Sequence, residues 1–582
     1  MRKLLVSLVF LLSTNYFFYH AFSQDIGSIF CWHYKEIYGG HDYEYNESIV
    51  KKGLPTNGTH WLDNMQWWEN IAEEIDYSGL DYVALLSRGN QPNAPDRGNG
   101  NPNHIPKLID ALDARGAHSV KLAIFDDMPN SWSGSKNWNE SGGASYTTSN
   151  PKFDISDTDN YKYIWDYNLK QALGHIPDER LYKIDGRPVI FFWNLKNTWF
   201  TNIEGNSAAI LEYIREQCQA EFGYNPFLIV QTDWFNSDPQ LTLSDVDAVH
   251  HWIKNGPQYS WTLTEENNYK IGIVAPGLRN PGHPGFMDPS MSTDDNGARL
   301  RDALENTVGA GARTTLIEGF TNAAESAALW RSTDEGLFRL YDYANQRLNI
   351  VRRYTRNPFP ETLKLEAETC DFNYDLTAAN IGGAFLYQGD LDVLKCSDTY
   401  GGWYVTETES NEWMEWREMP LLEQNRFQLR YKSTAPSSVK MSVDGNNLPT
   451  ASLPSTGGVW SNNDVGSHAL SENGYHTVRL TIVSGSPDIN YFYRINEATV
   501  NSSLVRTDEH NDVQIFPNPA SDFVRITANG IIEEVCFYSI TGELQMRSVY
   551  GSEEEFELNI SNLNPGLYFL KINNQTHKLM IR

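Results

Sequence analysis

The sequence predicts an α/β protein, with a (β/α)8 barrel of the TIM type followed by two all-β sandwich domains. Between residues 25 and 360, eight short apolar runs alternate with helix-like segments. After Phe359-Pro360 the helical period disappears and short alternating strands follow over 363–498. A polar stretch, 499–512, reads as a linker to a last strand-rich segment, 513–582. A chain of 582 residues is also too long for one core, so several domains are expected.

The eight apolar runs have the length and composition of strands that are buried on both faces. They cover residues 27–33, 80–86, 120–125, 188–193, 227–232, 248–252, 271–275 and 314–320. The amphipathic segments between several of them cover residues 63–77, 160–173, 208–222, 298–308 and 335–353. This alternation predicts a parallel sheet, and eight units predict its closure into a barrel. An open doubly wound sheet is the alternative, although no glycine-rich phosphate turn follows any run.

The N-terminus indicates export from the cytoplasm. A basic start at residues 2–3, an apolar run at 4–12 and small residues before Gln24 predict a cleavable signal peptide over 1–23. No later segment is long and apolar enough to span a bilayer. The net charge of −28 argues against a nucleic acid or an anionic membrane as partner.

Aromatic and cysteine residues narrow the class of protein further. The 17 Trp and 31 Tyr exceed the usual needs of a core, and their flat rings suit the faces of sugars, although β-rich domains can also pack many aromatics. The five cysteines lack zinc-site spacing. Cys370 and Cys396 share one predicted domain, so a disulfide between them stays open.

Carboxylates lie where several of the barrel strands end, which is where functional groups gather in this fold. Asp126 and Asp127 follow the third run, Asp233 follows the fifth and Glu318 ends the eighth. Glycosidic cleavage requires one acid for the leaving oxygen and one carboxylate as nucleophile or base. These four are therefore the candidate catalytic residues, with Glu318 and Asp233 favoured. One of Asp126 and Asp127 could instead cap the following helix.

Aromatic and hydrogen-bonding residues occupy the other strand ends, as expected for sugar binding. The candidate substrate-binding residues are Trp32, His33, Arg88, Trp193, Asn194, Trp234, His250, Trp252 and Glu325. His250 and His251 point to opposite faces of one strand, so at most one enters the barrel mouth. A satisfied core histidine and outer-layer tryptophans are the alternatives. No paired-histidine spacing supports a metal triad, so no catalytic cofactor is expected.

Two segments of the barrel resemble glycoside hydrolases. Residues 183–191, Lys-Ile-Asp-Gly-Arg-Pro-Val-Ile-Phe, are similar to the segment before strand four in barrels related to families 71 and 99. Residues 318–325 resemble the Gly-Phe/Trp-Asn-x-x-x-Glu sequence of that group, but Asn322 stands where the first of two family 99 glutamates would fall. The mechanism of that family is therefore not carried over. The chain more closely resembles an uncharacterised barrel group found beside carbohydrate modules, which implies the fold more than the reaction.

The segment 363–498 resembles family 6 carbohydrate-binding modules. The motifs that carry the resemblance are Leu-Glu-Ala-Glu at 365–368, Gly-Trp-Tyr at 402–404, Asn-Glu-Trp-Met-Glu-Trp at 411–416, Thr-Gly-Gly-Val-Trp at 456–460 and Asp-Ile-Asn-Tyr-Phe at 488–492. The resemblance implies that Trp403 or Tyr404, Trp460 and Asn490 bind sugar. It also implies a structural calcium held by Glu366 or Glu368.

The last segment, 513–582, resembles the type IX secretion sorting domain. It opens with Val-Gln-Ile-Phe-Pro-Asn-Pro-Ala, contains Ser-Ile-Thr-Gly at 539–542 and continues with Leu-Asn-Pro-Gly-Leu-Tyr-Phe at 563–569. The resemblance implies passage through the type IX secretion machinery. The protein is therefore expected to be secreted or held on the outer cell surface.

Together these observations predict a secreted, endo-acting glycoside hydrolase with a polysaccharide substrate. A non-catalytic glycan-binding protein is the main alternative, and a surface protein that binds host or neighbouring cells is a second. Basic residues in the predicted loops, Arg88, Lys254, Arg279 and His283, leave open an anionic substrate such as sulfated fucan.

Overall fold

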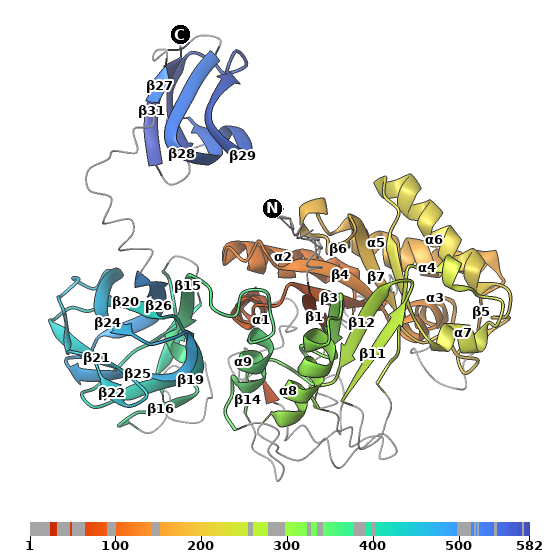
Figure 1. The fold of residues 1–582 in the computed structure, drawn as a ribbon, viewed down its shortest axis with the longest axis horizontal. Helices are drawn as coiled ribbons and strands as arrows, with labels where there is room; N and C mark the ends of the chain where they lie inside the picture. The colour runs from red at the N-terminus through yellow and green to blue at the C-terminus, as the bar shows by residue number, and fades with distance from the viewer. Residues whose placement is uncertain are drawn as a thin grey trace, which may run out of the picture. The chain divides into compact units, whose positions relative to one another are not determined.

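The computed structural model describes two compact units, 1–497 and 498–582 (Figure 1). The described residues are 24–31, 47–48, 65–89, 100–141, 152–253, 260–277, 297–322, 327–333, 342–377, 391–398, 402–497, 514–516, 520, 523–539, 544–572 and 575–581. The predicted signal peptide lies outside them. Within these ranges, no helix combines the length and the apolar character needed to cross a bilayer.

A nearly closed, mixed sheet with the curvature of a barrel forms the centre of the first unit (Figure 1). Its order is β10-β9-β7-β4-β3-β1-β13-β12-β11, and all neighbours except β12 and β11 are parallel. The parallel strands are β1 (Asp25–Phe30), β3 (Tyr82–Ser87), β4 (Lys121–Asp126), β7 (Arg187–Phe192), β9 (Phe227–Gln231), β10 (Ala248–His250), β12 (Tyr269–Val274) and β13 (Thr314–Ile317). Each of them overlaps one of the apolar runs in the sequence.

Helices cover the outside of this sheet. They are α1 (Met65–Ser78), α2 (Ile105–Ala114), α3 (Ser135–Ser141), α4 (Tyr161–Ile164), α5 (Lys170–Gly174), α6 (Ser207–Phe222), α7 (Asp233–Ser237), α8 (Ala298–Leu304) and α9 (Gln346–Arg352). π-helical turns at Pro129–Gly134, Trp165–Leu169 and Glu305–Gly309 precede or follow several of them. Short strand pairs, β2 (Glu47–Ser48) with β14 (Ser332–Thr333) and β5 (Phe153–Asp154) with β8 (Phe200–Thr201), and β6 (Lys183–Ile184) on β7 complete the layer.

The alternation of strand and helix fails after β10, so the closed (β/α)8 barrel of the sequence prediction is not confirmed. Here β11 (Trp261–Glu266) and β12 form an antiparallel hairpin through Asn267-Asn268, both at positive φ. Because β11 takes the free edge of β12, no ladder joins β10 to β12 in the described part of the chain. A hydrogen bond from Thr262 Oγ1 to the carbonyl oxygen of His251 links β11 to the end of β10.

Side chains alternate between the inside and the outside of the barrel-like sheet. Phe125, Phe191 and Ile229 belong to an inner core, whereas their neighbours pack against the helices. At the N-terminal end of the strands, Tyr82 stacks on Tyr182 with ring centroids 3.9 Å apart. A Cβ atom on Gly27 would lie 2.2 Å from the Tyr82 ring, so this position requires glycine. Among the described residues, the N-terminal end of the inner core is therefore filled by packed side chains.

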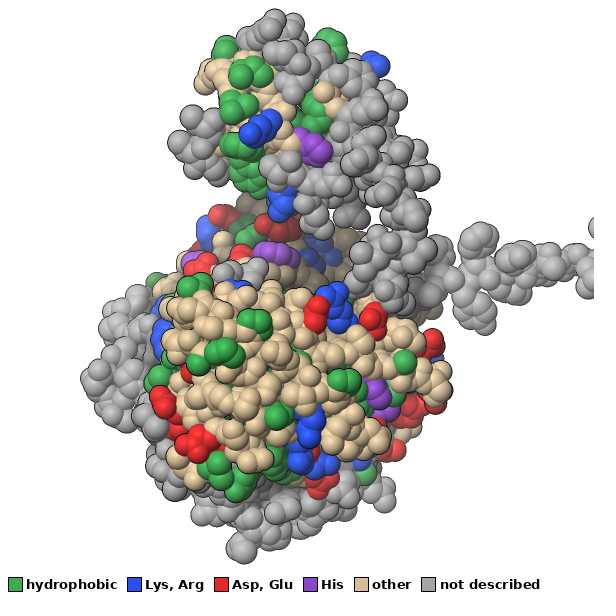
Figure 2. Space-filling model, turned by 90° about the vertical axis from the view of Figure 1, so that its left-hand side faces the viewer, with side chains coloured by type: hydrophobic (Ala, Val, Ile, Leu, Met, Phe, Trp, Pro, Cys, Tyr) green, Lys and Arg blue, Asp and Glu red, His purple; other side chains and the backbone are tan. Residues whose placement is uncertain are grey.

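Residues 362–496 form a β-sandwich. One sheet has the order β17-β18-β26-β20-β24 with β15 on β26, and the other has the order β16-β19-β25-β21-β22 with β23 on β21. The strands are β15 (Thr362–Glu366), β16 (Phe372–Tyr374), β17 (Val393–Lys395), β18 (Trp403–Val405), β19 (Trp413–Leu421), β20 (Gln424–Lys432), β21 (Ser437–Val443), β22 (Asn446–Asn447), β23 (Ala451–Leu453), β24 (Ser461–Ala469), β25 (Gly474–Ser484) and β26 (Asp488–Asn496). On the face that Figure 2 shows, hydrophobic and charged side chains are scattered among backbone and other side chains. Cys370 and Cys396 are both buried and are not joined by a disulfide.

Polar contacts join the sandwich to helices α1, α2 and α9 of the barrel. Trp403 Nε1 donates to Asn70 Oδ1 at 3.1 Å, and an Arg115 guanidinium nitrogen lies 3.1 Å from Glu366 Oε1. Glu73 and Glu74 line a cavity of about 300 Å³ at this junction. The barrel-like domain and the β-sandwich therefore share a buried interface that contains charged residues.

The second unit is a five-stranded sheet. Its strands are β27 (Gln514–Phe516), β28 (Phe523–Tyr538), β29 (Leu544–Asn559), β30 (Gly566–Ile572) and β31 (Gln575–Ile581). Val524, Phe537, Leu570 and Leu579 form a small hydrophobic core of its own.

The junction predicts a stability that falls as the pH rises. Burial raises the pKa of Glu74 from 4.5 to about 8, although Arg331 donates its backbone N–H to this carboxyl group at 2.9 Å. A raised pKa favours the neutral acid in the fold, so its stabilisation is present below 4.5 and is lost as the pH rises through about 8. We expect Glu74→Gln, which stays neutral, to flatten the dependence of melting temperature on pH. An equal slope in the variant and the wild type would contradict this role for Glu74.

Candidate functional site

Four inward-facing side chains form a row where neighbouring strands β4, β7, β9 and β10 end. The ladders pair Asp126 with Phe192, Phe192 with Val230, and Gln231 with His250. The inward residues at this level are therefore Asp127, Trp193, Gln231 and His250. Arg88, which follows β3, extends the row through an ion pair with Asp127 at 3.3 Å.

Each of these four side chains has one buried polar atom without a hydrogen-bond partner among the described residues. The atoms are Asp127 Oδ1, Trp193 Nε1, Gln231 Oε1 and His250 Nδ1. Buried polar atoms in folded proteins are nearly always paired, because leaving one unpaired costs about 1–3 kcal/mol. Four of them side by side at the open end of the barrel are a place for water or for the hydroxyl groups of a ligand.

Asp127 is the carboxylate that the fold turns toward the mouth. It is 4% exposed, and Asn130 Nδ2 donates to its Oδ2 at 2.7 Å. Burial raises the pKa of Asp127, and the opposing charge of Arg88 limits that rise. A carboxyl group with a raised pKa and a free oxygen can carry a proton to a leaving group.

Asp126 faces the other way, into the helical layer. Trp132 Nε1 and Asn168 Nδ2 donate to its Oδ2 at 3.0 and 3.1 Å, and Ser131 donates to its Oδ1. Burial raises its pKa to about 7 in spite of these donors. This outward position supports the π-helical turn after β4 and removes Asp126 from the set of carboxylates that can reach a substrate in the mouth.

Asp233 and Glu318 occupy two other strand ends. Asp233 begins α7, accepts from Gln231 Nε2 at 3.2 Å and pairs with Lys196 at 3.0 Å. Glu318 follows β13, is 8% exposed and lies on the inward face two residues after Leu316 of the inner core. Gly319, with φ of 73°, then turns the chain away. Asp127 and Glu318 are thus inward carboxylates separated by strands β3 and β1.

His250 is a neutral acceptor in this row. Its Nε2 lies 3.0 Å from the carbonyl oxygen of Phe192, which can only accept, so Nε2 carries the hydrogen and Nδ1 a lone pair. Burial lowers the pKa of His250 to about 4, which keeps the ring uncharged at neutral pH. His251 points outward, where its Nδ1 lies 3.1 Å from Thr232 Oγ1.

Two of the predicted tryptophans line the mouth and one does not. Trp193 and Trp252 are partly exposed, with ring centroids 6.2 Å apart and planes at 69°. Trp234 is fully buried in the outer layer, where its Nε1 donates to the carbonyl oxygen of Trp193 at 2.9 Å, so it is not a sugar platform. Asn194 is buried on the same outer side.

Several predicted site residues lie outside the described ranges. They are Trp32, His33, Lys254, Arg279, His283 and Glu325.

A second group of predicted residues meets on the sandwich. The rings of Tyr404 and Trp460 lie 5.3 Å apart at 79°, and Lys432 Nζ lies 4.3 and 4.7 Å from their centroids. Asn490 is buried beside them and donates to Asp398 Oδ2 at 3.1 Å, while its Oδ1 has no partner among the described residues. Two near-perpendicular rings beside an amide suit a sugar ring and its hydroxyls.

Trp403 is excluded from this group because it packs against the barrel. It is 4% exposed and bonded to Asn70. Between the two alternatives at 403 and 404, the structure therefore leaves Tyr404 as the exposed aromatic residue.

The two glutamates expected to hold calcium have different surroundings. Glu366 Oε1 lies 3.1 Å from Arg115 and 2.5 Å from Lys364, so its charge is already compensated. Both carboxylate oxygens of Glu368 are buried without a partner in the described ranges. These ranges hold no cluster of three acidic, histidine or cysteine residues suited to a metal. One buried carboxylate supplies at most two of the about six to eight oxygen ligands that calcium takes, so the structural calcium stays a prediction.

The sequence interpretation missed Gln231 and Lys432. Gln231 is a neutral amide inside an apolar run, and only its place two residues before Asp233 on one strand face could have identified it. Lys432 ends an alternating strand at the same edge as the predicted aromatics, but its contact with Tyr404 and Trp460 depends on pairing between distant strands.

Comparison with known proteins divides the chain into three matched segments. Residues 22–372 match the model of a domain of unknown function, DUF5010. Residues 387–494 match a carbohydrate-binding module of family 35, where the motifs resemble family 6. Residues 514–582 match a secretion system C-terminal sorting domain, so the protein is secreted or located at the cell surface. No curated protein matches the chain.

Carbohydrate-binding modules are among the solved structures to which the chain is similar. The C-terminal family 6 module of LamC, a marine laminarinase from Zobellia galactanivorans, is 20% identical, covers 23% of this chain and 99% of that chain, and has a TM-score of 0.19. A family 35 module from Clostridium thermocellum is 22% identical, covers 24% of this chain and 99% of that chain, and has a TM-score of 0.18.

The two neighbouring aspartates should differ in their effect on stability. Asp126→Ala leaves three buried donors without an acceptor, each at a cost of about 1–3 kcal/mol, whereas Asp127 already has an unpaired oxygen. We expect Asp126→Ala to lower the free energy of unfolding, measured in urea, by more than Asp127→Ala does. The opposite order would show that Asp127 is the structural member of the pair.

Proposed function

The chain belongs to the DUF5010 family, and we propose that it is a secreted, endo-acting glycoside hydrolase that its carbohydrate-binding module holds on a polysaccharide. The observation that carries the proposal is the row of unpaired polar atoms on Asp127, Trp193, Gln231 and His250. Donors and acceptors fixed at one level beside the rings of Trp193 and Trp252 suit the hydroxyls and the face of a sugar.

The proposed chemistry uses the two inward carboxylates. Asp127, whose pKa burial raises, would protonate the glycosidic oxygen as it leaves. Glu318 would act from β13 as nucleophile or as base for water. Asp233, bound to Lys196 and Gln231, would orient the substrate beside them. Asp126 would support the turn that carries Asp127 and Asn130.

The residues of the sandwich indicate which class of polysaccharide binds, but they do not indicate which glycosidic linkage is cleaved. Tyr404 and Trp460 form a small platform, and Lys432 adds a positive charge that Asp488 balances at 3.3 Å. In the mouth, Arg88 and Lys196 are likewise paired with Asp127 and Asp233. These balanced pairs favour an uncharged polysaccharide over a sulfated one.

Loss of the carboxylates should abolish cleavage. We expect Asp127→Asn and Glu318→Gln to reduce the release of new reducing ends from the responsive polysaccharide by at least about 10²-fold, because each removes a proton-transfer or covalent role. Glu212→Gln, an exposed carboxyl change on α6, is the matched control and should keep full activity. Plant, algal and fungal polysaccharides form the test panel.

Full activity in both mouth variants would overturn the assignment. If wild-type protein releases no product from any polysaccharide but still binds one, the barrel is a non-catalytic glycan-binding domain.

Retention on polysaccharide should depend on the sandwich aromatics. We expect Trp460→Ala to abolish the retardation of the protein in an affinity gel, because it removes one of the two rings that contact Lys432. Tyr374→Ala, an exposed aromatic change on the other sheet, is the control and should migrate like the wild type in the same gel. Unchanged retardation of Trp460→Ala would place sugar binding elsewhere on the protein.

A further inference from the structure

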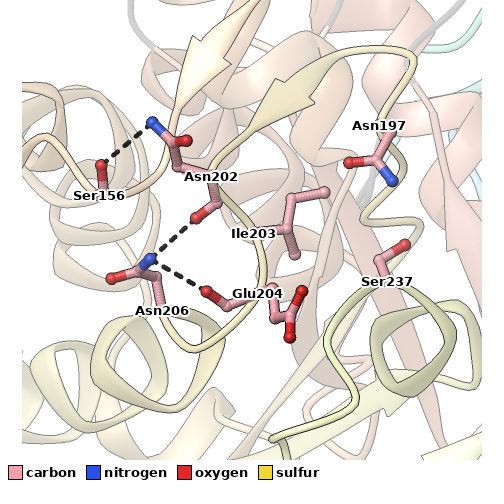
Figure 3. Close-up of a pocket in the computed structure, with 7 residues that line it drawn as sticks. All are labelled: Ser156, Asn197, Asn202, Ile203, Glu204, Asn206 and Ser237. Carbon is pink, nitrogen blue, oxygen red and sulfur yellow. Dashed lines mark hydrogen bonds between the residues drawn. The ribbon is translucent and has the colours of Figure 1, made fainter.

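A polar hollow lies between the segment after β7 and the end of α7 (Figure 3). Its volume is about 610 Å³, and ligand pockets usually measure about 300–1,000 Å³. Three asparagines, two serines and Glu204 line it, and Ile203 is the one apolar side chain among its lining residues. This lining suits a ligand that is recognised through hydroxyl groups.

One wall is held in place by its own amide groups. Asn202 Nδ2 donates to Asp154 Oδ2 at 2.8 Å, and Asn206 Nδ2 donates to the carbonyl oxygen of Asn202 at 2.9 Å (Figure 3 shows Asn206). These bonds use the amide nitrogens. The two side-chain oxygens accept no hydrogen bond from another described residue, so they can accept one from a ligand.

The opposite wall carries Asn197, Glu204 and Ser237, whose side chains lie on the same side of the hollow in Figure 3. None of the three side chains has a hydrogen-bond partner within the described ranges. Asn197 and Ser237 can both donate and accept, which is what a sugar hydroxyl requires.

A buried carboxylate joins the two segments that form the hollow. Asp238, which is 1% exposed, accepts from the backbone N–H groups of Gly205 at 2.9 Å and Ser207 at 3.1 Å. Asp238 also accepts a hydrogen bond from the backbone N–H of Gln240 at 3.0 Å. The hollow is therefore preformed, and a ligand would order little of the protein on binding.

The hollow is continuous in sequence with the proposed site. Asn197 follows Lys196, which pairs with Asp233 at 3.0 Å, and Ser237 ends the short helix that Asp233 begins. At about 1.5 Å of rise per residue, this helix separates Asp233 from Ser237 by only about 6 Å along its axis. Lys196 and α7 therefore connect the lining of the hollow to Asp233 of the proposed site.

We propose that this hollow is an outer subsite for an uncharged sugar unit of the same polysaccharide, bound by hydrogen bonds and not by stacking. The proposal rests on the proposed function, because it needs a glycan chain in the mouth. Its described lining holds no lysine, arginine or histidine, and the Glu204 carboxylate would repel a sulfated or carboxylated unit.

The experiment compares short and long neutral ligands on the full chain. Trp460→Ala is present throughout, so that the module does not dominate binding. One protein carries Trp460→Ala alone, and the other carries Trp460→Ala together with Asn197→Ala and Ser237→Ala. Titration calorimetry measures the affinity of both proteins for disaccharides and for longer oligosaccharides of cellulose, laminarin and mannan. We expect the pair to weaken binding of the longer ligands about tenfold, as expected for one or two lost hydrogen bonds, and to leave disaccharides unaffected. Gln219→Ala replaces an exposed amide near the end of α6 and is the matched control. It should change neither the affinity for disaccharides nor the affinity for longer ligands.

The outcomes separate this inference from the proposed reaction. Loss of long-ligand affinity in a protein that cleaves no polysaccharide would support the subsite and reject hydrolysis. If the protein with Asn197→Ala and Ser237→Ala still cleaves polysaccharide and binds the longer ligands with unchanged affinity, the subsite is rejected and the proposed hydrolase activity stands. Equal losses for disaccharides and longer ligands would show damage to the mouth and would also overturn the subsite.

Discussion

Strand register decides which residues reach the mouth of the barrel-like sheet. Side chains alternate along each strand, so a shift of one residue would exchange the inward and outward sets. The observed ladders place Asp127, Gln231 and His250 at one level facing inward and send Asp126 into the helical layer. The proposed site depends on this arrangement, because no other part of the described barrel brings unpaired polar atoms from four adjacent strands together.

The outward residues have a role in keeping that register. Asp126 connects the end of β4 to Trp132 and Asn168, and Trp234 reaches back to the backbone of β7. These bonds lie in a buried layer that contains Trp132 and Trp234, where breaking them is costly. The outward residues Asp126 and Trp234 therefore hold the strand ends in place. The inward row of polar atoms is not needed for this purpose.

Much of the fold could be predicted, because parallel strands buried on both faces appear as apolar runs. The hairpin at β11 could not, since residues 261–266 carry polar side chains at alternate positions and so form no apolar run. Asp126 and Asp127 were both plausible because sequence shows that they face apart but not which one faces inward. Trp403 and Tyr404 stay alternatives in the sequence because the burial of Trp403 depends on docking between two domains, which no local pattern encodes.

A crystal structure of the Glu318→Gln protein with a bound neutral oligosaccharide would show whether the row of polar atoms on Asp127, Gln231 and His250 binds sugar. We expect sugar hydroxyls within hydrogen-bond distance of Asp127 Oδ1, Gln231 Oε1 and His250 Nδ1, with a sugar face against Trp193 or Trp252. Sugar bound only at Tyr404 and Trp460, with ordered waters alone on the row of polar atoms, would contradict it.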